Sequence, residues 1–154
     1  MITIQTVHNI RRGARITFWN GIYAILLGIL SLVFMNPLIK MNFRNINVVW
    51  QVFSKYNPEI ASFFIKMLIL KGVFVILMGV IILSLSEYIL KKKDKTAWVL
   101  LFTIGLIFWA SLLTIEILSK NVYSISASLV GWVFFIIGML LPIKYYLQGE
   151  ENSY

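Results

Sequence analysis

Long runs of apolar residues, separated by short polar segments, dominate the chain. A helix needs about 20 mainly apolar residues to cross the hydrocarbon core of a membrane, and four runs reach that length. They cover roughly residues 16–35, 60–90, 97–118 and 122–147. This pattern predicts an all-α, polytopic integral membrane four-helix bundle, with residues 1–154 forming a single membrane domain.

The connection between the first two runs, residues 36–57, carries the pattern of a further helix. Ile46, Val49, Trp50 and Phe53 follow one another at i, i+3, i+4 and i+7, with polar residues between them. Such a segment is amphipathic but too short to span, so we expect an interfacial helix. It would cap the bundle or, alternatively, offer a surface to a partner or to lipid.

The ends of the predicted spans carry recognisable signals. Asn57 and Pro58 form a typical helix start, with the asparagine side chain as the cap and proline in the first turn. Trp98, Tyr145 and Tyr146 stand beside lysines at span ends. Aromatic residues in that position are typical of membrane–water interfaces, so we predict interfacial anchors.

Three of the spans contain two glycines seven residues apart, which places both on one face of a helix. Helices in lipid associate mainly through small residues that allow their backbones to approach closely. These faces are therefore predicted to form the contacts of the bundle, and the alternative is a glycine-lined path for a solute. The predicted packing residues are Gly21, Ala24, Gly28, Gly72, Gly79, Gly105, Gly131 and Gly138.

The composition agrees with a membrane protein and excludes several kinds of chemistry. Apolar residues make up 60% of the chain and charged residues 13%, against about 45–50% and about 25% in soluble domains. There is no cysteine, and His8 in the N-terminal tail is the only histidine. Disulfides, thiolate catalysis and iron–sulfur clusters are excluded, and imidazole metal sites nearly so. We predict no catalytic residue, metal or cofactor.

The net charge of +8 is explained by topology. Lysine and arginine collect in the cytoplasmic segments of membrane proteins. Eight of the fourteen basic residues fall in the N-terminal tail, the 91–95 connection and the C-terminal end, so both termini are predicted to be cytoplasmic. The expected partner is the lipid bilayer, with other membrane subunits or a second copy as further candidates. Nucleic acid is not an expected partner.

Two acids lie near the ends of the spans, each four residues before a lysine. Glu87 precedes Lys91 and Glu116 precedes Lys120, the favourable orientation for an ion pair on a helix. We predict interfacial ion pairs, and proton or cation binding is the alternative. Trp109 and Trp132 lie well inside their spans. They are predicted to fill helix contacts, or alternatively to line a flat pocket for an apolar ligand or lipid.

The layout resembles the DoxX-like group of small four-helix membrane proteins. The residues that carry this resemblance, together with the long first connection, are Arg15, Gly21, Gly28, Gly72 and Gly79. Members of that group often have an acid near the glycine of the second span, whereas here Lys71 stands directly before Gly72. No functional residue is carried over. The resemblance implies an accessory role in a membrane redox or stress-response assembly.

These features together predict a small non-enzymatic membrane protein that acts as an accessory, assembly or interaction subunit. The alternatives are a carrier or channel for a small neutral or apolar solute, and a membrane protein that binds lipid or quinone. A transporter coupled to ions is disfavoured because no acid, base or histidine lies at mid-depth.

Overall fold

The structure is a computed structural model that describes residues 4–148, and every regular element in that range is a helix. The prediction of an all-α membrane bundle is confirmed, because four helices are long and apolar enough to span a bilayer. The protein is therefore a multi-pass membrane protein. Its elements are α1 (Ile4–Val33), α2 (Met35–Asn45), α3 (Trp50–Tyr56), α4 (Pro58–Lys92), α5 (Lys95–Leu118), α6 (Val122–Leu140) and α7 (Ile143–Gln148).

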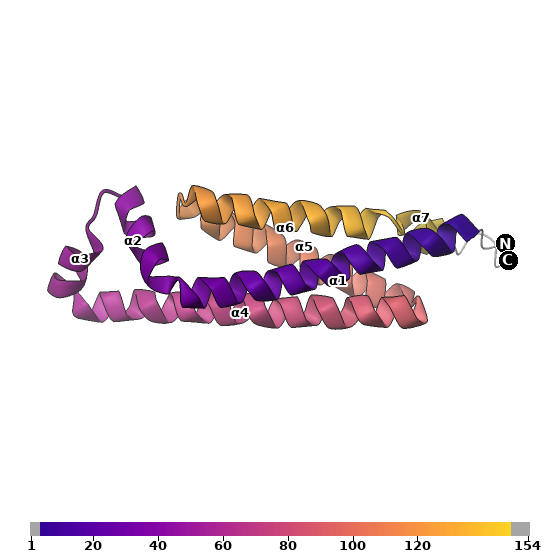
Figure 1. Cartoon of the computed structure of the whole chain (residues 1–154), viewed down its shortest axis with the longest axis horizontal. Helices are drawn as coiled ribbons and strands as arrows, with labels where there is room; N and C mark the ends of the chain where they lie inside the picture. The colour runs from indigo at the N-terminus through magenta and orange to yellow at the C-terminus, as the bar shows by residue number, and fades with distance from the viewer. Residues whose placement is uncertain (1–3, 149–154) are drawn as a thin grey trace.

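The four long helices form an up-down-up-down bundle in which each helix packs against two antiparallel neighbours (Figure 1). The ring runs α1, α4, α5, α6 and back to α1, with the most extensive contact between α1 and α4. At one end, here named the tail end, lie the start of α1, the α4–α5 link and α7. At the other, the cap end, lie α2, α3 and the α5–α6 link. The first turns of α4 extend beyond α6 toward α3.

Polar residues define where α5 and α6 begin. The carboxylate of Asp94 accepts a hydrogen bond from the backbone N–H of Ala97 at 2.7 Å. The side-chain oxygen of Asn121 accepts one from the backbone N–H of Ser124 at 3.3 Å. Both contacts satisfy N–H groups that have no partner within the helix. Helix α4 begins at Pro58 as expected, but the Asn57 side chain makes no capping hydrogen bond.

The single amphipathic helix predicted within residues 36–57 is wrong. The chain instead forms α2 and α3 with a break at residues 46–49, and Asn47 adopts the left-handed conformation (φ 58°) that asparagine tolerates well. Ile46 and Val49 consequently lie exposed instead of joining one apolar stripe. Phe43 of α2 takes their place, with its ring 4.7 Å from that of Trp50 and 4.9 Å from that of Phe53.

The fourth span is shorter than the predicted range of 122–147. Helix α6 ends at Leu140, and a turn containing Pro142 separates it from the short α7. The turn folds α7 back on the bundle, so Tyr146 stacks on Trp98 with their rings 5.0 Å apart. Both rings are buried, which corrects their assignment as anchors exposed to the interface. Burial, with smaller effects of Tyr145 and Asp94, raises the pKa of Tyr146 to about 12.

The glycines of α1 and α4 face one another across the tightest helix contact. A Cβ atom placed on Gly21 would lie 2.9 Å from the carbonyl oxygen of Gly79, and one on Gly28 would lie 2.8 Å from that of Gly72. Because the helices are antiparallel and both glycine spacings are seven, the two pairs meet in register two turns apart. The backbones thus touch directly, as small residues permit in lipid. Ala24, between the two pairs, is fully buried.

The remaining predicted glycines accommodate larger neighbours. Gly138 of α6 lies against Gly13 and Thr17 of α1. On the opposite side of the ring, Gly105 makes room for the phenyl ring of Phe135, and Gly131 makes room for the indole of Trp109. The α5–α6 contact is therefore made by large rings lying over glycines rather than by two opposed glycine faces.

Candidate functional site

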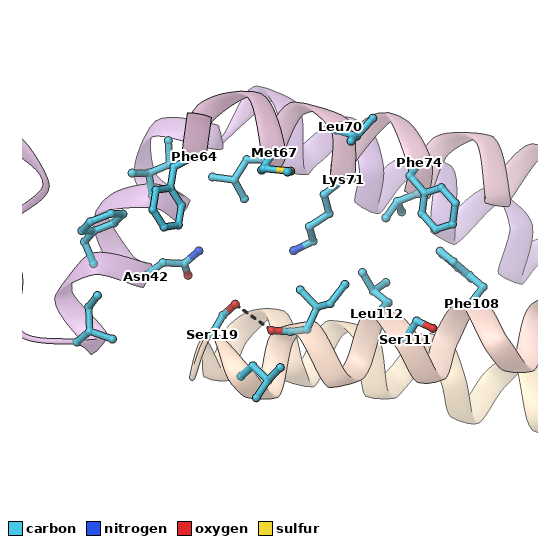
Figure 2. A pocket seen from close by; sticks show the side chains of 17 residues that line it. Asn42, Phe64, Met67, Leu70, Lys71, Phe74, Phe108, Ser111, Leu112 and Ser119 are labelled. Carbon is cyan, nitrogen blue, oxygen red and sulfur yellow. Dashed lines mark hydrogen bonds between the residues drawn. The ribbon is translucent and has the colours of Figure 1, made fainter. Parts of the chain in front are cut away.

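A cleft of about 650 Å³ lies near the cap end between α4 and α5, with α2 at one of its ends (Figure 2). Its volume falls in the range of about 300–1,000 Å³ that is typical of small-molecule sites. Nearly all of its wall is apolar. The lining residues are Ile39, Asn42, Phe43, Ile46, Phe64, Met67, Leu68, Leu70, Lys71, Phe74, Val75, Phe108, Ser111, Leu112, Ile115, Leu118 and Ser119.

Aromatic rings close the cleft at both of its ends. Phe74 of α4 and Phe108 of α5 lie 6.1 Å apart at the end directed toward mid-membrane. Phe43 of α2 and Phe64 of α4 lie 5.5 Å apart at the cap end. Phe64 and Phe74 are separated by ten residues of helix, or about 15 Å along its axis. The cleft is thus an elongated apolar space that runs parallel to the helices.

The side chain of Lys71 enters the cleft between these two ends, as Figure 2 shows. Its ammonium group forms an ion pair with Glu116 of α5, which is buried with 5% of its surface exposed. The predicted pair between Glu116 and Lys120 is therefore wrong. Lys120 sits in the α5–α6 turn with a positive φ of 51°, and its carbonyl accepts a hydrogen bond from Asn45. The other predicted pair, Glu87 with Lys91, forms at 2.6 Å on an exposed surface.

The ion pair separates the cleft from two smaller spaces on its other side. One is an open pocket of about 270 Å³ lined by residues of α1, α2 and α6, which shares Lys71, Val75 and Leu112 with the cleft. The other is a polar chamber of about 20 Å³ below α2, lined by both charged residues and four polar side chains, among them Asn42. That volume exceeds the roughly 10–15 Å³ that one water molecule requires. Lys71 lines all three spaces.

Asn42 supplies the second nitrogen that faces the cleft, and a chain of hydrogen bonds fixes its orientation. The side-chain oxygen of Asn121 caps α6, so its amide nitrogen is the group that points to α2. That nitrogen donates to the side-chain oxygen of Asn42 at 3.0 Å. The NH₂ group of Asn42 is consequently left on the cleft side, where Figure 2 shows it pointing in the direction of Lys71.

The middle of the bundle is closed by a buried polar cluster, which the sequence-based predictions did not include. The amide nitrogen of Asn20 donates to the carbonyl of Gly131 at 2.7 Å, and its oxygen accepts the indole N–H of Trp109 at 3.0 Å. Both side chains are buried, Trp109 completely. Tyr23 stacks on Trp109 and donates to the carbonyl of Ala127 at 2.9 Å. These contacts join α1, α5 and α6.

Trp109 therefore belongs to the core and does not line a pocket for an apolar ligand, which corrects that alternative. Trp132 is partly buried against the core, and its indole N–H has no hydrogen-bond partner among the residues described. Nearer the tail end, Ser86 of α4 lies 2.9 Å from the hydroxyl of Thr17 of α1, and both are buried. Below the cleft, the bundle is thus packed and hydrogen-bonded.

Replacing Asn20 with leucine should destabilise the bundle by about 1–2 kcal/mol. The substitution removes two hydrogen bonds between helices and leaves the Trp109 N–H unpaired in an apolar interior. Unfolding by SDS, followed by circular dichroism, measures the change. Thr114→Val is the matched control, because it removes a hydroxyl that bonds only within its own helix at an exposed position, and we expect less than about 0.5 kcal/mol. Equal losses in both variants would contradict the role of Asn20.

No protein-family model matches the chain, and no curated protein or solved structure matches it either. The resemblance to the DoxX-like group stays a prediction. The function proposed below therefore depends on the geometry of the cleft.

Proposed function

We propose that the protein is a non-enzymatic membrane protein that binds a membrane-derived amphiphile, with its apolar chain in the cleft between α4 and α5. The observation that carries this proposal is the combination of an elongated apolar space with a single charged side chain projecting into it. Such a space with a few placed polar groups is typical of ligand sites.

The rim of the cleft supports entry from the membrane rather than from water. The rim residues Leu70, Phe74, Ile115 and Leu118 are apolar and exposed on the outer surface of two spanning helices. In a bilayer that surface meets acyl chains. A ligand that already resides in the membrane can therefore enter sideways between α4 and α5 without crossing a polar barrier.

Packing beneath the cleft favours binding over transport. A carrier or channel needs a path that continues across the bilayer, but the helices close on one another below Phe74 and Phe108. Trp109, Leu101 and Phe135 are fully buried there, and glycines bring α1 and α4 into backbone contact. The carrier or channel alternative therefore has less support from the geometry than binding within the cleft.

The residues that face the cleft also favour binding over turnover. The Ser119 hydroxyl donates to the carbonyl of Ile115 at 2.9 Å. The Lys71 ammonium donates to Glu116 and is engaged in that ion pair. Residues 8–146 contain no cluster of three metal-binding side chains in the structure. A nucleophile activated by a base is missing from this part of the chain.

Filling the cleft should weaken binding while leaving the fold intact. We expect Ser111→Trp, at an exposed position in the cleft wall, to lower labelling by a long-chain alkyl diazirine probe in nanodiscs on the order of tenfold, or about 1.4 kcal/mol. Mass spectrometry of labelled peptides from α4 and α5 provides the readout. Ile107→Trp adds the same ring to the exposed lipid side of α5 and serves as the control. Undiminished labelling in Ser111→Trp would refute the proposal.

A further inference from the structure

The nitrogen atoms that face the cleft indicate which head the bound amphiphile carries, an inference that rests on the proposed function. We infer that the cleft selects a single-chain amphiphile with an uncharged, carbonyl-bearing head such as an acyl ester. The carbonyl oxygen accepts hydrogen bonds from the Lys71 ammonium and the Asn42 amide, and the chain runs toward Phe74 and Phe108.

The two nitrogen groups that face the cleft are donors, whereas the Ser111 and Ser119 hydroxyls can both donate and accept. An ammonium group has three N–H bonds, and the ion pair of Lys71 uses one of them, to an oxygen of Glu116. The oxygen of Asn42 is occupied by Asn121, so its NH₂ group remains for a ligand. The Ser119 hydroxyl already donates to a backbone carbonyl of its own helix. Two nitrogen donors from two different helices can thus share one acceptor placed between them.

The charge balance favours an acceptor without a net charge. Lys71 and Glu116 neutralise each other, and Glu116 lines the spaces on the far side of the pair rather than the cleft. An anionic head would add a second, unbalanced negative charge beside Glu116 in an apolar surrounding, which is costly. A cationic head would lie beside the Lys71 ammonium, which carries the same charge, and the cleft lining offers it hydroxyl oxygens but no carboxylate. A carbonyl oxygen gains a charge-assisted hydrogen bond without adding a charge.

The walls around Lys71 favour a small head and one chain. On the cap side of Lys71 the cleft is lined mainly by apolar groups, among them Ile39, Phe43 and Met67, with Asn42 and Ser119 as the polar ones. Two polar side chains are few partners for a phosphodiester or a sugar. On the other side Val75, Leu112 and the two terminal rings form an apolar wall in which Ser111 is the polar residue. A ligand with a compact carbonyl head at Lys71 and one chain running toward Phe74 and Phe108 fits the walls on both sides of Lys71.

The test compares four diazirine probes that share one long alkyl chain and differ only in the head. Three probes carry a methyl ester, a carboxylate or a trimethylammonium group as the head. The fourth probe is the alkyl chain without a head group. Each probe is added at equal mole fraction to the full chain in nanodiscs, and labelling of α4 and α5 peptides is quantified. We expect the ester to label at least about fivefold more than the headless chain, as a hydrogen bond to a charged donor predicts. The carboxylate and the trimethylammonium probe should label less than the ester.

Two variants test whether the preference for the ester depends on the Lys71 and Asn42 donors. Lys71→Met combined with Glu116→Gln removes both charges together, so no buried charge is left unpaired. Asn42→Asp keeps an oxygen for Asn121 but replaces the NH₂ donor. In both variants the ester preference should fall by about threefold or more, while labelling by the headless probe stays within about twofold of wild type.

Each outcome has a definite meaning. If the headless probe labels the cleft but the ester has no advantage, or if the ester preference survives in both variants, the inferred head is wrong and the proposed function stands. Stronger labelling by the carboxylate or the trimethylammonium probe also overturns the inferred head. If no probe labels the cleft of the wild-type chain, the proposed function itself fails.

Discussion

Replacing Lys71 with methionine should destabilise the folded protein by about 3–5 kcal/mol, the range measured when one partner of a buried ion pair is removed. The reason is Glu116, which is 5% exposed and would keep a buried charge without its cation. Methionine matches the lysine stem in length and flexibility, so the loss reports the charge more than the packing. The SDS fraction at half unfolding, measured by circular dichroism, gives the change.

Two comparison proteins make the result specific. Lys71→Met with Glu116→Gln should recover most of the lost stability, since both partners are then uncharged. Lys91→Met breaks the exposed pair with Glu87, whose side chain is 49% exposed, and should cost less than about 1 kcal/mol. If Lys71→Met costs no more than Lys91→Met, then the Lys71–Glu116 pair does not hold α4 to α5.

Replacing Gly79 with leucine should separate α1 from α4 and cost about 3 kcal/mol or more, at the upper end of the range for overpacked cores. A Cβ at Gly79 would lie 2.8 Å from both the Gly21 carbonyl oxygen and the backbone nitrogen of Ile25. Backbone atoms cannot rotate away as a side chain can, so the helices themselves must move. The SDS midpoint again provides the measurement.

Val80→Leu is the matched control for Gly79→Leu. It places the same side chain one residue further along, at a position that is 47% exposed on the lipid-facing side. We expect a change within about 0.5 kcal/mol. Indistinguishable midpoints for the two variants would show that the α1–α4 contact does not depend on backbone approach.

The periodicity of the sequence predicts the helices well because each span is decided locally. Twenty consecutive apolar residues specify a spanning helix whatever its neighbours are, and two glycines seven residues apart specify a common face. Which faces meet is not a local property. The pairing of Gly21 with Gly79 and of Gly28 with Gly72 depends on the antiparallel register of two helices far apart in the sequence.

The candidate site was missed for the same reason. Spacing within one helix suggested Lys120 as the partner of Glu116, but the partner is Lys71, 45 residues away in the chain. A signal did exist, because Lys71 is a cation directly before Gly72, whose face packs inward. The asparagines gave similar hints. Asn20 is the only amide within the first apolar run, Asn45 is the last residue of α2, and Asn47 lies in the break between α2 and α3.

The contact between Asn20 and Gly131 also has a consequence for the synthesis of the protein. The two residues are 111 positions apart, and a ribosome adds about 5–20 residues per second. For roughly 5–20 seconds after Asn20 emerges, its amide therefore has no carbonyl of α6 to bind. During that interval the nascent first span presents a polar group to lipid, or to whatever machinery shields it. The last span to be made is thus the one that completes the centre of the bundle, and a chain that ends before Gly131 would expose both Asn20 and Trp109.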